Sequence, residues 1–123
     1  MRGEKTLGIG RKGDMLSVSV YVPSESHGRL IDSAKRQTAL NNVLKDLSRL
    51  FGGATAQDGI GAWVNGDGDL VREHVTIAKS YADDDEVTAH WRDVLELGRY
   101  VKAYLGQESV LVSQEPVSAV EFV

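Results

Sequence analysis

The sequence predicts an α+β protein, a ferredoxin-like β-α-β-β-α-β plait with an extra C-terminal strand. Two long segments carry apolar residues at helical spacing, with capping signals at their ends. Short segments in which apolar and polar residues alternate lie before, between and after them. The segment NGDGD, residues 65–69, is a hairpin signal between the two middle strands. This order predicts an antiparallel sheet with both helices on one face.

The bulk composition limits the functional classes. The 123 residues suit one domain with a hydrophobic core, and the absence of cysteine excludes disulfides, thiol catalysis and zinc-thiolate sites. The net charge of −4 is atypical of a general nucleic-acid binder, whose affinity rests on cations placed against phosphates. No apolar run approaches the length of a membrane span. We therefore expect a cytoplasmic protein whose partners include neither nucleic acid nor membrane.

The N-terminal segment, residues 1–14, is rich in glycine and charge and predicts a flexible arm ahead of a single ferredoxin-like domain at 15–123. Gly8, Gly10 and Gly13 have the G-x-G-x-x-G spacing of a dinucleotide-binding loop. That loop must follow a strand and open a helix, whereas seven residues precede this one and a strand pattern follows it. The spacing therefore does not indicate a dinucleotide site.

The first strand and the first helix follow directly from periodicity. Residues 15–22 place alternate apolar side chains on one face: Leu16, Val18, Val20 and Val22. Residues 23–28 read as a loop, and a helix is expected from about 32 to 51. Its apolar stripe consists of Leu40, Val43, Leu44, Leu47, Leu50 and Phe51. Asp32 or Ser33 can cap its start, and Gly52 supplies a left-handed stop.

The second half repeats the pattern. Alternating apolar residues lead up to the turn at 65–69, and the return strand runs from Leu70 to Tyr81. A second helix is expected from about 84 to 105, with Gly98 allowing a close approach and Gly106 as its stop. Its apolar stripe consists of Val87, Trp91, Val94, Val101 and Leu105. A last strand is expected at 108–114, after which residues 117–123 add an edge strand or pair with a neighbouring chain.

Glu73 is the least expected side chain in the return strand. Val71, Val75 and Ile77 alternate around it, so Glu73 falls in their apolar row. A carboxylate there is costly unless it is paired, hydrogen-bonded or facing a cavity. It is therefore either a site residue or one half of a salt bridge at a strand end or subunit contact. A turn centred on Asp67-Gly68 would place Ala62 opposite Glu73, whereas a three-residue loop would change the pairing.

Trp63 and Glu108 are the other candidate site residues. Trp63 follows Gly59 and Gly61, so its ring can form a flat wall for an aromatic or cationic ligand, or pack as an ordinary core or interface tryptophan. Glu108 opens the last strand and is either a site carboxylate or a solvated charge. No metal site is expected, because the three histidines have no ligand spacing: His27, His74 and His90.

The helix-free face of such a plait must be polar or be covered. Covering by a second subunit is common for small sheets, and the C-terminal segment offers a spare strand for exchange. The sequence therefore predicts a homo-oligomer.

Four short segments carry a resemblance to a known family: FGGAT at 51–55, GIGAW at 59–63, DGDLVREHVTI at 67–77 and LGQESVLV at 105–112. The arrangement resembles a family of small phage and bacterial ferredoxin-like proteins, many without an assigned activity, and is similar to the phage S-adenosylmethionine lyases. The resemblance covers roughly residues 15–114 and implies a homotrimer with a small-molecule ligand between subunits. It also implies release of methylthioadenosine and homoserine lactone from S-adenosylmethionine, without cofactor, water or metal.

The resemblance also implies roles for individual residues. Glu73 matches the strand glutamate of the lyases and Glu108 matches their late glutamate, both in the catalytic site. Trp63 stands in the substrate site where the family has an aromatic hydroxyl, and an indole lacks that hydroxyl.

Three functions are therefore open. The first is an S-adenosylmethionine lyase-like enzyme. The second is a non-catalytic oligomeric plait, related to phage or host defence, that binds a nucleotide-like small molecule or a partner protein. The third is a structural role in which Glu73 makes an interface salt bridge.

Overall fold

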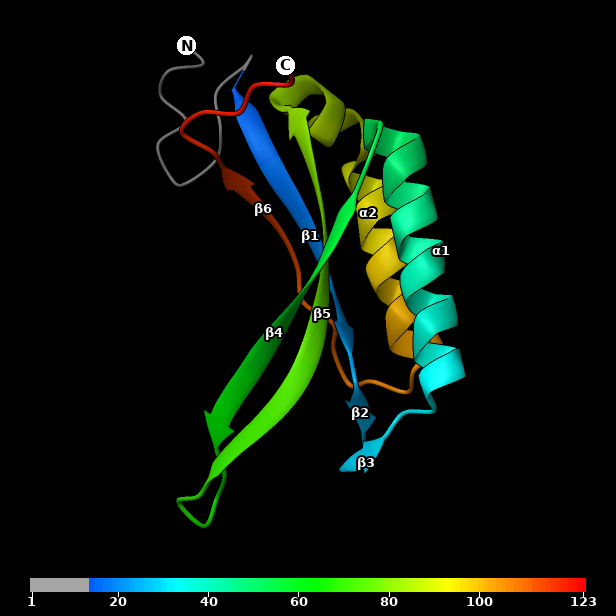
Figure 1. Ribbon diagram of the computed structural model, residues 1–123, viewed down its shortest axis with the longest axis vertical. Helices are drawn as coiled ribbons and strands as arrows, with labels where there is room; N and C mark the ends of the chain where they lie inside the picture. Colours follow the sequence, from blue (N-terminus) through cyan, green and yellow to red (C-terminus); the bar gives the residue numbers. More distant parts are fainter. Residues whose placement is uncertain (1–13) are drawn as a thin grey trace.

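The computed structural model describes residues 14–123 as one four-stranded antiparallel sheet with two helices on one face (Figure 1). The strand order is β4-β5-β1-β6, and both helices cross the same side of the sheet. The elements are β1 (Met15–Pro23), α1 (Ser33–Phe51), β4 (Thr55–Val64), β5 (Leu70–Asp83), α2 (Asp84–Tyr104) and β6 (Val112–Pro116), with a small hairpin of β2 (Glu25–Ser26) and β3 (Arg29–Leu30). This confirms the predicted ferredoxin-like plait.

The hydrophobic core lies between the sheet and the helices. The four apolar side chains of β1 predicted to share a face are at most 1% exposed. They pack with buried residues of both helices: Ala39, Val43, Leu47, Val87, Val94, Leu97 and Val101. No helix in residues 14–123 is long and apolar enough to cross a membrane.

The ends of both helices carry the expected signals. Asp32 caps α1 by accepting a hydrogen bond from the Lys35 N–H at 3.1 Å, and Gly52 ends it with a φ of 91°. Asp83 and Glu86 form a capping box at the start of α2. A β-carbon on Gly98 would lie 2.6 Å from Cγ2 of Val112, so this glycine does allow α2 to approach β6 closely.

The register of the β4–β5 hairpin differs by one residue from that of a turn at Asp67-Gly68. Glu73 pairs with Gly61 instead of Ala62, and Trp63 pairs with Val71. The cause is a five-residue loop, 65–69, in which Oδ1 of Asn65 accepts hydrogen bonds from the N–H groups of Asp67 and Asp69. An odd loop length places Trp63 on the same face as Glu73.

The C-terminal strand also begins later than predicted. β6 starts at residue 112 instead of 108, so Glu108 lies in the connection that follows α2. Residues 117–123 form no further strand, although the Val117 N–H still donates to the Met15 carbonyl at 3.0 Å. The predicted N-terminal arm and its glycine spacing lie outside the described residues, except for residue 14.

The far end of the β4–β5 hairpin extends beyond both helices (Figure 1). Apolar side chains there are exposed on both faces of the hairpin, including Trp63 at 49%, Val64 at 66% and Leu70 at 61%. This end of the sheet therefore has no cover within residues 14–123.

Candidate functional site

Glu73 lies on the helix-free face of the sheet. The alternate row of β5, which includes Thr76, Ala78, Ser80 and Ala82, is buried under the helices. The apolar row predicted from Val71, Val75 and Ile77 is therefore half-exposed on the opposite face, and Glu73 shares it. A carboxylate in this row avoids burial in the core.

One oxygen of Glu73 is held by the chain that follows β1. The ladder between β1 and β5 ends at the pair of Pro23 with Val75. The next two backbone N–H groups leave the ladder and need acceptors. Glu73 supplies one, because its Oε2 accepts from Ser24 N at 3.2 Å and from Glu25 N at 3.1 Å. The second oxygen, Oε1, has no hydrogen-bond partner within residues 14–123.

An open groove of about 430 Å³ begins beside this carboxylate. Its lining residues come from β1, β4, β5 and the approach to β6: Tyr21, Pro23, Gly59, Ile60, Gly61, Glu73, Val75, Ile77 and Leu111. Gly59 and Gly61 pair with Val75 and Glu73, so no β4 side chain covers these two β5 residues. The result is an apolar groove with a fixed carboxylate at its edge.

Trp63 shares the face of Glu73 but does not line the groove. Its partner Val71 is two residues from Glu73 along β5, so Trp63 and Glu73 are diagonal cross-strand neighbours. With half of its surface exposed, the indole stands beside the groove towards the hairpin turn.

Glu108 belongs to a different depression of the same chain. It is exposed and lines a hollow of about 230 Å³ with His27, Gly106, Gln107 and Ser109. The structure therefore does not bring Glu73 and Glu108 into one cavity within a single chain.

Two hydrogen bonds to the backbone of Glu25, together called the Glu25 clamp, connect the two depressions. The Glu25 N–H donates to Glu73, and its carbonyl accepts from Gln107 Nε2 at 2.7 Å. Beside it, the Ser26 hydroxyl donates to the Gly106 carbonyl at 2.7 Å. Glu73 and the turn at 106–107 thus both hold the short segment 24–26, which contains β2.

Tyr21 and the Glu25 clamp were missed by the sequence analysis. Alternation along β1 already places Tyr21 opposite the core valines. It does not pair Tyr21 with Ile77, and that pairing brings it into the row of Glu73. The clamp and the Ser26 contact had no sequence signal, because they join Glu25 and Ser26 to residues about fifty and eighty positions away and use backbone groups that no residue pattern marks.

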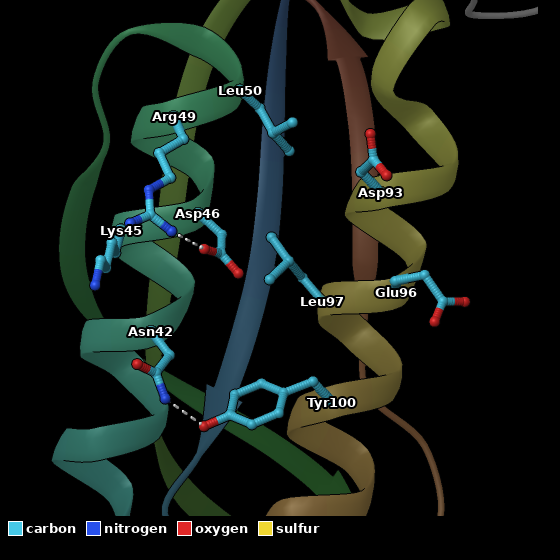
Figure 2. Close-up of a pocket in the computed structure, with 9 residues that line it drawn as sticks. All are labelled: Asn42, Lys45, Asp46, Arg49, Leu50, Asp93, Glu96, Leu97 and Tyr100. Atoms are coloured by element: carbon cyan, nitrogen blue, oxygen red, sulfur yellow. Dashed lines mark hydrogen bonds and ion pairs between the residues drawn. The ribbon is translucent and has the colours of Figure 1, made fainter.

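Another cavity, of about 560 Å³, lies between the two helices (Figure 2). Leu50 and Leu97 face each other across it, and Asn42 donates to the Tyr100 hydroxyl at 2.7 Å. The charges along its rim have both signs, and Arg49 pairs with Asp46 on its own helix. Most of its charged side chains are exposed to solvent, so this cavity is a weaker candidate than the Glu73 groove. Residues 14–123 contain no cluster of three or more acidic, histidine or cysteine side chains that could hold a metal.

No family model and no curated protein matches the chain. Solved structures do match it. A phage SAM lyase in the apo state has a TM-score of 0.59 and 18% identity, covering 90% of this chain and 87% of that one. A phage SAM lyase in complex with S-methyl-5'-thioadenosine has a TM-score of 0.56 and 18% identity, over 88% and 84%.

Proteins with other descriptions match at similar levels. The divalent ion tolerance protein CutA1 from Ehrlichia chaffeensis has a TM-score of 0.52 and 9% identity, over 91% of this chain and 88% of that one. A Bacillus cereus protein related to NIF3 has a TM-score of 0.52 and 19% identity over 94% of this chain, which spans only 29% of that protein. At these identities the likeness shows a shared ferredoxin-like fold.

Proposed function

We propose that this protein is an S-adenosylmethionine lyase-like enzyme whose substrate binds in the Glu73 groove. The observation that carries the proposal is the state of the Glu73 carboxylate. One oxygen is fixed by two backbone N–H groups, while the other is open beside an apolar groove. A charge held in this way can receive a cation without rearranging, which lowers the cost of binding.

The groove suits a sulfonium compound with a nucleoside attached. S-adenosylmethionine carries a cationic sulfur, an α-ammonium and a flat base. A carboxylate attracts the cations more strongly beside apolar walls than in open water. Aromatic faces bind cations as well, and both Tyr21 in the groove and Trp63 beside it offer one.

The reaction needs no proton transfer and no water. A carboxylate oxygen of the substrate attacks its own γ-carbon and closes the lactone. The bond between that carbon and sulfur breaks, and its electron pair goes to sulfur, which leaves as the neutral thioether of methylthioadenosine. The step is intramolecular and removes two opposite charges, so an enzyme contributes mainly by folding the substrate in a partly dry site.

The proposal includes a homotrimer with the substrate between subunits. Glu108 does not line the Glu73 groove of its own chain, so in this proposal it reaches the groove from a neighbouring subunit. The exposed apolar end of the β4–β5 hairpin supports association. Such an enzyme would meet its substrate in the cytoplasm.

The test is incubation of the purified protein with S-adenosylmethionine, with chromatographic detection of methylthioadenosine. Bonds to charged groups are worth about 1.5–3 kcal/mol, so Glu73→Gln is expected to lower kcat/KM by about 10- to 150-fold. Glu115→Gln is the matched control, because this exposed glutamate of β6 pairs with Ser17, away from the groove. Absence of product from the unmodified protein at high concentration would refute the lyase proposal.

A second function is favoured by one observation. Trp63 has no hydroxyl where the resemblance implies one, which supports binding without turnover of a nucleotide-like molecule, or of a partner protein, in the same groove. Native mass spectrometry of freshly purified protein would detect a retained small molecule. An empty protein whose melting temperature responds to no nucleoside or nucleotide would count against small-molecule binding.

A further inference from the structure

Among residues 14–123, Tyr21 is the only residue besides Glu73 that brings a polar side chain to the groove. The other seven lining residues are aliphatic, proline or glycine. Within residues 14–123 of one chain, any hydrogen bond from a lining side chain to a ligand must therefore come from Glu73 or from the Tyr21 hydroxyl. The groove thus has one anionic group and one neutral donor and acceptor.

The backbone of Tyr21 is fixed on both sides. Tyr21 pairs with Ile77 in the antiparallel ladder with β5. On its other side, its N–H donates to the Leu111 carbonyl at 3.0 Å. Both neighbours also line the groove, so the ring stands on a sheet position that the ladder holds in place.

The hydroxyl of Tyr21 has no partner within residues 14–123. The side chain is half-buried, and a buried tyrosine hydroxyl usually has a hydrogen-bond partner. The Asn42–Tyr100 bond shows such a partner for another half-buried tyrosine of this chain. At Tyr21 the hydroxyl is left for solvent or for a molecule in the groove.

We infer that Tyr21 is a ligand-binding residue of this groove, whose hydroxyl hydrogen-bonds the nucleoside part of a cationic nucleoside while Glu73 faces its charge. This inference rests on the proposed function and adds a specificity residue to it. The two side chains occupy different strands, β1 and β5, so one ligand must span both to contact them together. A simple organic cation would use Glu73 and leave the hydroxyl unbound.

The test combines a labelled protein with a single-atom change. All four tyrosines are replaced by 3-fluorotyrosine, and the Tyr21 fluorine resonance is assigned by its loss in Tyr21→Phe. Addition of S-adenosylmethionine, or of S-methyl-5'-thioadenosine as a neutral probe, should shift the Tyr21 resonance in a saturable way. Tyr21→Phe should weaken binding of either probe by about 2- to 12-fold, the range expected for one neutral hydrogen bond.

Tyr81→Phe is the matched control. Tyr81 lies on the same sheet face, paired with Ser17, and lines a different cavity. The Tyr81→Phe protein should bind both probes with the affinity of the unmodified protein. If Tyr21→Phe does not fold, the Tyr21 resonance is assigned by elimination from the phenylalanine variants of the other three tyrosines, and its shift in the unmodified labelled protein is then the deciding measurement.

Two negative results have different meanings. Binding that leaves both the Tyr21 resonance and the affinity of Tyr21→Phe unchanged overturns this inference and leaves the proposed function standing. No binding of either probe to the unmodified protein overturns the proposed function and this inference together.

Discussion

Glu73 serves the fold and the proposed site through different atoms of one carboxylate. Its Oε2 accepts hydrogen bonds from two N–H groups at the end of the β1–β5 ladder. Its Oε1 has no hydrogen-bond partner within residues 14–123 and lies beside the groove. The position in an apolar row was predictable from the alternation of three β5 residues. Its partners were not, because they depend on where a ladder between strands about fifty residues apart comes to an end.

The fixed oxygen of Glu73 is expected to contribute to stability without any ligand. Glu73→Ala removes the acceptor of two partly buried N–H groups, which solvent can replace only in part, so unfolding should require about 1–3 kcal/mol less. Glu73→Gln retains an acceptor oxygen and should lose less. Urea unfolding measures both, and amide exchange at Ser24 and Glu25 should be faster in Glu73→Ala. Unchanged exchange at these two amides would show that Glu73 does not hold them.

At the scale of elements, periodicity identified both long helices and the strands around them, because each covers a core that demands apolar side chains at fixed spacing. The register of the β4–β5 hairpin was not predictable in the same way. It depends on Asn65, whose side chain closes a five-residue loop with two backbone N–H groups. A one-residue difference there decides whether Trp63 shares the face of Glu73.

The contact of α2 with β6 is the sharpest test of packing between elements. Gly98→Ala would place a β-carbon 2.6 Å from Cγ2 of Val112. Overpacking costs about 1–3 kcal/mol, and the better helix propensity of alanine offsets about 1 kcal/mol, so a net loss of about 1 kcal/mol is expected. Val112→Ala removes the opposing methyl groups. In the double variant the clash is therefore gone, and Gly98→Ala should stabilise the protein relative to Val112→Ala through the better helix propensity of alanine. Additive effects in a double-mutant cycle would mean that the two residues are not in contact.

For the whole molecule, the sequence predicted the plait and left the helix-free face open to several interpretations. In the structure, that face has two parts that differ in polarity. One part near β6 carries Ser17, Ser19 and Ser113, whereas the part around Tyr21 and Ile77 forms the apolar groove. A sequence without a partner chain cannot specify what covers the second part, because association depends on the shape of a surface made by three strands.

The exposed end of the β4–β5 hairpin provides the last prediction, that the protein self-associates through it. Val64 and Leu70 are large apolar side chains at the end of this hairpin, 66% and 61% exposed, and water contact with them is unfavourable. Replacing both by threonine keeps the preference for strand, removes much of that apolar surface and changes no residue that lines the groove. In the proposed assembly the unmodified protein is a trimer, so sedimentation velocity is expected to show a trimer for it and a monomer for the variant, and any lyase activity should fall because the groove loses its neighbouring subunit. Leu30→Thr, at a side chain 80% exposed outside this hairpin, is the control and should leave the trimer intact. A monomeric unmodified protein at high micromolar concentration would contradict both the interface and the trimeric site.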